Sequence, residues 1–167
     1  MLFKKVRIES IGYELGPEVV SSHDLEDQFS DTLDRLNVRS GILESISGIH
    51  ERRFWPLGTK PSTIATIAAQ KAIAAAGIRA DQIGCLISTS VMRDYIEPST
   101  ASLIHGNLRL PASCLNYDLG NACLGFVSGM YNIALMIEMG VITHGLVVAG
   151  EAGRQLIEST TSYLRQP

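Results

Sequence analysis

The chain has 167 residues, which is the length of one ordinary globular domain. It carries 14 Lys and Arg against 17 Asp and Glu, so its net charge of -3 leaves no basic excess to neutralise a phosphate backbone or an anionic membrane surface. Hydrophobic residues make up 46% of the chain and charged residues 19%, which excludes the disordered class and predicts a packed core. We therefore expect a folded protein that does not bind nucleic acid.

The cysteines and the apolar segments set the expected environment. Cys85, Cys114 and Cys123 form no Cys-x-x-Cys pair, so neither a disulfide framework nor a zinc site is predicted. The first fifteen residues alternate polar and apolar types, unlike a signal peptide. The most apolar region, residues 122–150, is interrupted by polar side chains before it reaches a bilayer-spanning length of about 20 residues. We expect no metal, no membrane span and a cytoplasmic location.

The first third of the chain predicts one strand, one helix and a long loop. Residues 6–15 alternate like a strand, and residues 22–36 carry apolar side chains at helical spacing. Residues 37–61 are rich in glycine and proline, which is typical of a loop. This loop holds a basic and aromatic cluster that is a candidate surface for a ligand, with Arg52, Arg53 and Trp55 at its centre.

The rest of the chain predicts alternating helices and strands. A helix over residues 62–76, capped by Ser62 and ended by Gly77, precedes a buried strand at 83–90. Pro98 then fits the first position of a helix that reaches residue 108. The remaining predicted elements are a strand at 114–119, a helix at 124–139, a strand at 145–149 and a helix at 153–164. This order predicts an α/β fold, a mixed and mostly parallel sheet with helices on both faces. No linker divides the sequence, so residues 1–167 are expected to form a single domain.

Cys123 is the candidate nucleophile. It follows a short strand and a turn of small residues, at the expected N-terminus of an apolar helix. Backbone N–H groups and the helix dipole favour a thiolate there, and a neighbouring N–H can bind an oxyanion. The alternative is that Cys123 is a small buried hydrophobe, which is the preferred interpretation of Cys85 and Cys114 within their apolar strands.

A nucleophilic Cys123 needs help from a base. Lowering a thiol pKa from about 8.5 to about 7 requires roughly 2 kcal/mol of preference for the thiolate. A helix terminus supplies about 0.3 to 2 kcal/mol, and apolar surroundings act in the opposite direction. No sequence context singles out one of the four histidines, which are His23, His50, His105 and His144. The base need not lie on this chain.

Three runs together resemble a known family. They are DLGNACLGF at residues 118–126, SGIHERR at 47–53 and EPSTA at 97–101. In combination they are similar to the thiolase superfamily, specifically its β-ketoacyl-ACP synthase III branch. Within that branch they most resemble the OleA family, whose members condense two fatty acyl-CoA molecules head to head in long-chain olefin biosynthesis. The resemblance spans essentially the whole chain and implies a thiolase-like fold, of which this chain is the N-terminal half.

The resemblance also implies a mechanism. Cys123 would take an acyl group from an acyl thioester, and the carbanion of a second acyl-CoA would then attack the Cys123 thioester in a Claisen condensation. OleA-like enzymes need a base for the α-proton, because their second substrate has no carboxylate to lose. The match to Glu-Pro-Ser-Thr assigns that base to Glu97, reaching the active site of the other subunit in a homodimer.

The sequence around these residues is also compatible with other roles. Glu97 ends a loop after a buried strand, where parallel α/β sheets place functional groups, but an acid before a helix can also simply face water and favour the helix dipole. In the resemblance, Arg52, Arg53 and Trp55 would meet the phosphates and adenine of CoA. Their alternative is an ordinary solvated charged loop. No cofactor is implied beyond the acyl thioester substrates.

Members of this family are longer than this chain. Their second half supplies a histidine and an asparagine that activate the cysteine and complete the oxyanion site, and neither can be matched here. We therefore expect a fragment, or one subunit whose remainder is a second chain. The alternatives within enzymes are a decarboxylating 3-oxoacyl-ACP synthase III of fatty acid biosynthesis and a hydroxymethylglutaryl-CoA synthase-like reaction. The alternative outside enzymes is a non-catalytic half-thiolase module that binds an acyl-CoA or a partner synthase.

Overall fold

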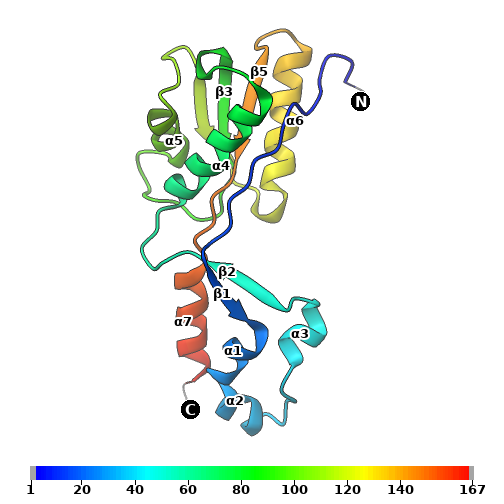
Figure 1. The fold of residues 1–167 in the computed structure, drawn as a ribbon, viewed down its shortest axis with the longest axis vertical. Coiled ribbons are helices and arrows are strands. Elements are labelled where there is room, and N and C mark those ends of the chain that lie inside the picture. The colour runs from blue at the N-terminus through cyan, green and yellow to red at the C-terminus, as the bar shows by residue number, and fades with distance from the viewer. Residues whose placement is uncertain (1–2, 166–167) are drawn as a thin grey trace. The chain divides into compact units, whose positions relative to one another are not determined.

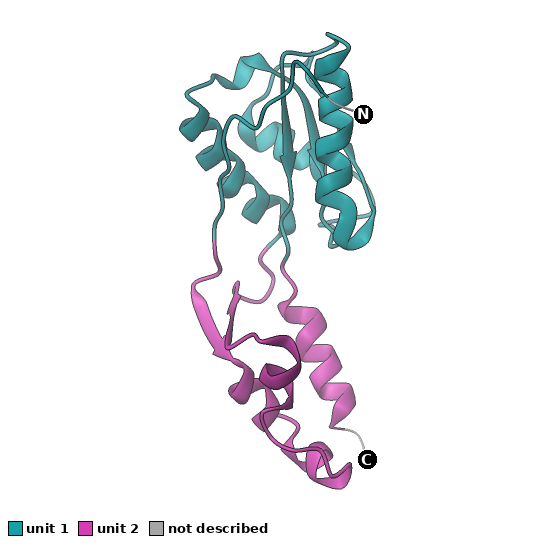
Figure 2. Cartoon of the chain, turned by 90° about the vertical axis from the view of Figure 1, so that its right-hand side faces the viewer, with its two compact units in different colours: residues 1–14, 60–151 teal, residues 15–59, 152–167 magenta. Residues whose placement is uncertain are grey.

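The computed structural model describes residues 3–165, and these form two compact units (Figure 2). The sheet unit comprises Met1–Glu14 and Lys60–Glu151, and the ribbon unit comprises Leu15–Thr59 and Ala152–Pro167. Each unit is assembled from two separate stretches of sequence. No single linker separates them, which is why the sequence gives no sign of the division.

The sheet unit is built on three parallel strands in the order β4-β3-β5 (Figure 1). They are β3 (Ile83–Ser88), β4 (Leu115–Asp118) and β5 (His144–Val148). In the central strand β3, the side chains of Cys85, Leu86 and Ile87 are all fully buried. Burial on both faces explains why this strand reads as a continuous apolar run, and the predicted parallel pairing is confirmed.

Helices cover both faces of this sheet, as predicted (Figure 1). On one face, α4 (Pro61–Ala76) and α5 (Thr100–Leu108) pack Ala65 and Ile104 against Leu86. On the other face, α6 (Gly125–Glu138) packs Ile133 against Cys85 and Ile87. A Cβ atom at Gly145 of β5 would lie 2.5 Å from the Ile133 side chain, so only glycine allows α6 to approach this closely.

The N-terminal segment differs from its prediction. Residues 6–15 are extended, but they pair with no strand among the described residues, so the predicted strand is wrong. The segment contacts α4 instead: the Ser10 hydroxyl donates to the Ala72 carbonyl at 2.7 Å, and a Cβ at Gly12 would lie 2.4 Å from the Ala72 nitrogen. Alternating polar and apolar residues favour an extended strand. A sheet forms only where a neighbouring strand accepts and donates the backbone hydrogen bonds.

Two short 3₁₀ helices complete the sheet unit, η1 (Ala80–Gln82) before β3 and η2 (Ala122–Leu124) before α6. The predicted helix end at Gly77 is confirmed, because Gly77 has a left-handed φ of 65° directly after α4. Ser62 does not cap α4, since Lys60 is the capping residue and Pro61 is the first helical position. Across residues 3–165, the helices are too short or too polar to cross a bilayer.

The ribbon unit combines an antiparallel strand pair with short helices. The strands are β1 (Glu18–Ser21) and β2 (Glu51–Phe54), and the helices are α1 (Ser22–Asp27), α2 (Ser30–Arg35), α3 (Ile42–Ser47) and α7 (Arg154–Leu164). The predicted helix over residues 22–36 is therefore broken into α1 and α2 at Gln28 and Phe29. The predicted loop over residues 37–61 contains α3 and β2, so the basic cluster begins on a strand.

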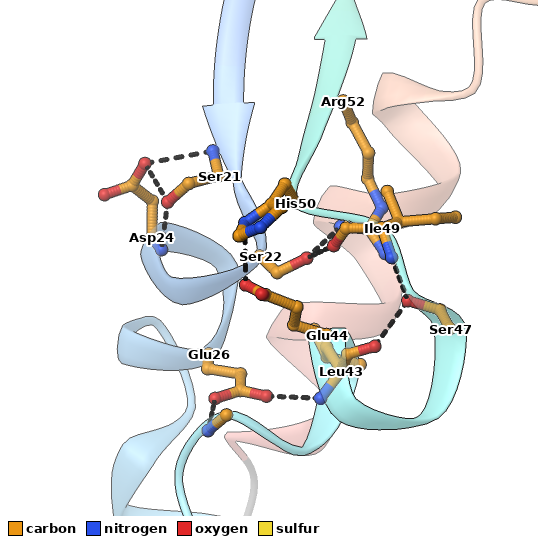
Figure 3. Close-up of polar contacts among 11 residues, drawn as sticks. Ser21, Ser22, Asp24, Glu26, Leu43, Glu44, Ser47, Ile49, His50 and Arg52 are labelled. Atoms are coloured by element: carbon orange, nitrogen blue, oxygen red, sulfur yellow. Dashed lines mark hydrogen bonds and ion pairs between the residues drawn. The ribbon is translucent and has the colours of Figure 1, made fainter.

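A buried carboxylate shapes the ribbon unit. Glu26 of α1 is 1% exposed and accepts hydrogen bonds from the backbone N–H groups of Gly41 and Leu43 (Figure 3). These donors belong to the start of α3, where Gly41 has a left-handed φ of 86°. Glu26 of α1 therefore accepts the free N–H groups at the start of α3 and holds the two helices together. This contact between α1 and α3 is polar and not apolar.

Candidate active site

The carboxyl ends of the three parallel strands carry the two principal candidate residues. The loop of residues 89–99 follows β3 and holds Glu97, while the turn after β4 holds Cys123. Parallel strands end at the same edge of their sheet, and α/β proteins place ligands and reactive groups at that edge. Glu97 and Cys123 thus lie in segments that follow strands ending at the same edge of the sheet unit.

Cys123 lies on the tight turn η2, directly before α6. The N–H of Leu124 donates to the carbonyl of Asn121 at 3.0 Å, and Ala122 has a positive φ of 43° that a side-chain-bearing residue rarely adopts. The prediction that the helix starts at residue 124 is off by one, because α6 begins at Gly125. The Cys123 residue is exposed, so the alternative of a small buried hydrophobe is wrong.

Small side chains allow this turn to sit on the end of the sheet. A Cβ at Gly125 would lie 3.0 Å from the carbonyl oxygen of Thr89, the residue after β3. The Asn121 amide donates to the hydroxyl of Ser128 at 2.9 Å, which ties the turn to the second turn of α6. These contacts hold Cys123 on a defined bend of the backbone.

Cys85 and Cys114 have the structural role predicted for them. Both are buried in the sheet unit. Burial, with a smaller contribution from neighbouring Cys114, raises the pKa of Cys85 to about 11. Burial also raises the pKa of Cys114. Neither thiol is available as a thiolate near neutral pH, so Cys123 is the candidate nucleophile of this chain.

Glu97 lies in the loop rather than at a helix start. The helix predicted to reach residue 108 is present, but its predicted start at Pro98 is two residues early, because α5 begins at Thr100 and Ser99 is its capping residue. The Ser99 hydroxyl accepts the N–H of Ser102 at 3.1 Å. Glu97 is therefore two residues outside the helix cap, and it is exposed.

Another carboxylate occupies the N-terminus of α5. Asp118, the last residue of β4, accepts the backbone N–H groups of Thr100 at 3.0 Å and Ala101 at 2.8 Å. These bonds satisfy the first free donors of the helix and place negative charge at the positive end of its dipole. Glu97 is not needed for that role, which weakens its alternative as a simple helix-terminal acid.

The Glu97 carboxylate has no hydrogen-bond or ion-pair partner among the residues that the structure describes. Other acids at this edge are occupied: Asp94, Asp118 and Glu151 each accept backbone N–H groups. A carboxylate that is free of internal contacts can accept a proton from an incoming substrate.

The sequence reasoning missed these three anchoring acids. A signal existed for Asp118 and Glu151, since Asp118 is the last residue of β4 and Glu151 lies three residues after β5. No local signal marks Asp94, because its partner Ser62 lies 32 residues earlier in the chain. Only the fold brings those two residues into contact.

The basic and aromatic residues belong to the ribbon unit, whereas Cys123 belongs to the sheet unit. Arg52 on β2 is half-buried, and its guanidinium donates to the Ser22 hydroxyl at 2.7 Å (Figure 3). Arg53 points to the opposite face of the strand and pairs with Glu51 at 3.3 Å. Trp55 follows β2 and is half-buried. Both arginines thus have a contact within the ribbon unit, and the exposed Arg53 is the more available cation of the two.

No histidine of the sheet unit lies at the Cys123 edge within the described residues. His144 begins β5, at the opposite edge of the sheet, and His105 contacts the carbonyl of Pro111, which precedes β4. In the ribbon unit, His23 lies 3.8 Å from Asp27 and His50 lies 3.1 Å from Glu44. Within residues 3–165 there is also no group of three or more His, Cys, Asp or Glu side chains that could hold a metal ion.

Comparison with known proteins gives consistent matches, although no family model matches the chain. The chain is 41% identical over 167 residues to an acyl-CoA:acyl-CoA alkyltransferase of Xanthomonas campestris, covering 100% of this chain and 49% of the relative. It is 41% identical over 160 residues to the Shewanella oneidensis protein of the same name, covering 96% of this chain and 46% of the relative. A β-ketoacyl-[acyl-carrier-protein] synthase III of Vibrio cholerae is 34% identical over 137 residues, which are 82% of this chain and 35% of that protein.

The fold agrees with these relatives. Cerulenin-bound OleA of Xanthomonas campestris superimposes with a TM-score of 0.96 at 41% identity, covering 100% of this chain and 48% of that one. Further solved structures of that protein carry a replaced glutamate, cysteine or histidine. The chain spans about half the length of the relatives it matches. The resemblance to the OleA family of the β-ketoacyl-ACP synthase III branch is confirmed, the chain has the thiolase-type fold, and the match fits the N-terminal half of these enzymes.

Proposed function

We propose that this chain is the nucleophile-bearing half of an acyltransferase that condenses two fatty acyl-CoA molecules to a β-ketoacyl product. The observation that carries the proposal is the exposed Cys123 on a tight turn at the carboxyl edge of the parallel sheet. The chain that holds this turn is 41% identical along its whole length to an acyl-CoA:acyl-CoA alkyltransferase. Cys123 is the nucleophile and Glu97 is the base.

In the first step, the Cys123 thiolate attacks the carbonyl carbon of an acyl-CoA. The tetrahedral intermediate collapses with cleavage of the bond to CoA sulfur, so the acyl group becomes a thioester of Cys123 and CoA leaves as a thiolate. Backbone N–H groups around the turn are the expected donors to the oxyanion.

In the second step, Glu97 accepts the α-proton of a second acyl-CoA. The resulting carbanion attacks the Cys123 thioester carbonyl, a carbon–carbon bond forms, and the Cys123 thiolate leaves. The absence of internal partners for Glu97 among the described residues supports this role, because a carboxylate already held by N–H donors is a weaker base.

The solved variants of the Xanthomonas campestris protein support the pairing of these residues. The glutamate and the cysteine replaced there are separated by the same number of residues as Glu97 and Cys123. The replaced histidine lies farther beyond that cysteine than this chain extends beyond Cys123. This supports the proposal that a C-terminal half or a second chain supplies a histidine, together with an asparagine.

The remaining proposals concern partners and location. We propose a homodimer in which Glu97 of one subunit serves the active site of the other, and a cytoplasmic setting. Arg53, Arg52 and Trp55 are proposed to bind the phosphates and adenine of CoA. Neither a metal nor an organic cofactor is required by this chemistry.

The test is intact-mass spectrometry of the native preparation before and after incubation with a long-chain acyl-CoA. We expect the mass of one acyl group to be added to this chain, and a co-purifying polypeptide that carries the rest of the site. The adduct should disappear in Cys123→Ala and persist in Cys114→Ser, which is the matched cysteine control. An adduct that persists in Cys123→Ala would refute the assignment of the nucleophile.

A decarboxylating β-ketoacyl-ACP synthase III is the second candidate, favoured by the 34% identity to the Vibrio cholerae enzyme. It predicts turnover with malonyl-ACP and no need for Glu97. Condensation of two acyl-CoA molecules that is lost in Glu97→Ala, while acyl transfer to Cys123 persists, would exclude it. Acyl-CoA binding without any covalent adduct would instead identify a non-catalytic half-thiolase module.

A further inference from the structure

The loop that carries Glu97 has no regular secondary structure, yet carboxylates anchor it along its length. At its start, Glu151 accepts the backbone N–H groups of Val91 at 2.6 Å and Met92 at 3.3 Å. At its end, Asp118 accepts the N–H groups that open α5. The middle of the loop is held by a carboxylate of its own, Asp94, three residues before Glu97.

Asp94 binds the start of α4 with both of its oxygens. One oxygen accepts the backbone N–H of Ser62 at 2.8 Å, and the other accepts the Ser62 hydroxyl at 2.6 Å. Ser62 is 5% exposed and belongs to the first turn of α4, whose Ala65 and Ala69 are fully packed in the core. Two bonds to one rigid residue fix the orientation of Asp94 as well as its position.

A second contact joins the same two segments. The Lys60 ammonium, which immediately precedes α4, lies 4.3 Å from the centre of the Tyr95 ring. Beyond Tyr95, the residues up to the cap of α5 are exposed, with Ile96 at 89% and Glu97 without a described partner. The location of the Glu97 carboxylate therefore depends on where Asp94 and Tyr95 are held.

We propose that Asp94, through its paired hydrogen bonds to Ser62, is a positioning residue that sets the place of the Glu97 carboxylate for α-proton removal. This inference rests on the proposed function. Asp94 does not meet the substrate; it acts by preventing the loop from shifting relative to the sheet edge. A displacement of about 1 Å in a catalytic group can lower a rate by about 10²-fold, which is the scale expected here.

The test separates the two half-reactions in the native preparation. In Asp94→Ala we expect acyl transfer to Cys123 to stay within about twofold of wild type and condensation to fall by about 10²-fold. Asp94→Asn keeps an acceptor for the Ser62 N–H and a donor for its hydroxyl, so it should recover most of the condensation rate. In a Glu97→Ala background, Asp94→Ala should cause no further loss, because Asp94 acts only through Glu97.

The chain offers a matched control in Asp24. One oxygen of its carboxylate accepts both the backbone N–H of Ser21 at 3.0 Å and the Ser21 hydroxyl at 2.6 Å, so the same two kinds of donor bind a carboxylate at the start of another helix, α1. Asp24→Ala should leave both half-reactions unchanged. If Asp94→Ala does not fold, Ser62→Ala takes its place, because it removes the hydroxyl bond to Asp94 and should lower condensation while leaving acyl transfer to Cys123 unchanged. Condensation at the wild-type rate in Ser62→Ala would then overturn the positioning role.

The outcomes distinguish this inference from the proposed function. No acyl adduct in wild type, or full condensation in Glu97→Ala, would refute the proposed function itself. If Glu97→Ala abolishes condensation but Asp94→Ala condenses like wild type, the positioning role alone is overturned. It is also overturned if Asp94→Ala lowers acyl transfer and condensation equally, or if its loss adds to that of Glu97→Ala.

Discussion

The sheet unit buries a continuous set of apolar side chains around β3, including Leu86, Ile87 and Ile104, whereas Leu25 is the one buried apolar residue among the described residues of the ribbon unit. In the ribbon unit the buried positions are mostly polar, and Glu26 and Thr32 are held there by hydrogen bonds. The candidate nucleophile Cys123 therefore belongs to a unit with an apolar core, while the candidate phosphate-binding arginines belong to a unit ordered by polar contacts. Truncating a buried apolar side chain should therefore destabilise the sheet unit most, and removing a buried polar contact should destabilise the ribbon unit.

The largest expected effect is in thiol labelling, which reports the apolar frame. A thiol with a pKa of about 11, such as Cys85, is ionised to about one part in 10³ at pH 8 and is also shielded by burial. Iodoacetamide at pH 8 should therefore label the exposed Cys123 more than about 10²-fold faster than the buried Cys85, and also faster than the buried Cys114, as read by peptide mass spectrometry. Equal labelling of all three would show that the sheet unit lacks the rigid core described here.

Truncation in the core of the sheet unit should be the most costly change in stability. Leu86 is fully buried between the sheet and the helices α4 and α5, so Leu86→Ala should lower the free energy of unfolding by about 2 to 5 kcal/mol. Leu156→Ala in α7, where the side chain is 64% exposed, is the control and should change it by less than about 1 kcal/mol. Urea denaturation measures both, and similar losses in the two variants would contradict the comparison.

Removing the charge of Glu26 should have a smaller effect, confined to the ribbon unit. Glu26→Gln keeps the shape but points an amide group at one of the two N–H donors of Gly41 and Leu43, at a cost of about 1 to 3 kcal/mol. Hydrogen exchange should show faster exchange in α1 and α3, with the amides of β3 unchanged. Faster exchange of the β3 amides in this variant would mean that the stability of the sheet unit also depends on Glu26.

The smallest expected effect is a loss of stability of the ribbon unit at acidic pH. Burial by itself raises the pKa of Glu26, but the hydrogen bonds from Leu43 and Gly41 outweigh it and hold the pKa below the usual value of 4.5. A carboxylate with a lowered pKa in the folded state contributes stability above the unfolded value, and this is lost as the pH falls through the folded one. The amides of α1 and α3 should thus exchange faster, relative to their intrinsic rates, below about pH 4.5, while those of β3 stay protected. Glu26→Gln should flatten this dependence on pH. A pH response that is unchanged in Glu26→Gln would assign it to other groups.

The sequence predicts those helices and strands whose burial is visible as a local pattern of apolar residues. The continuous apolar runs of β3 and β5 and the Gly77 end of α4 were placed within a few residues, because each pattern is local. The strand predicted at residues 6–15 failed because alternation does not provide a neighbouring strand. The single helix predicted at 22–36 failed at Phe29, where the backbone leaves the helical region with a φ of -134°.

The candidate site divides in the same way. Cys123 could be selected from its turn of small residues before an apolar helix, but its exposure could not, since the same turn could have been covered. The position of Glu97 after a strand could be predicted from the sequence. The structure was needed to show that Asp118, and not Glu97, accepts the N–H groups at the start of α5.

The sequence alone indicated the class of the fold and the alternation of strands and helices in the sheet unit, since these depend on neighbours within a few positions. It also indicated the two candidate residues, Cys123 and Glu97. The tertiary structure decided which acids are occupied and which one is free, because the bonds of Asp94 to Ser62 and of Asp118 to Thr100 join positions 32 and 18 residues apart. It also decided that the chain forms two units, since each unit is closed by contacts between two distant stretches. Hydrogen bonds and packing between remote segments have no local sequence signature, and at this sheet edge they determine which carboxylate is left for function.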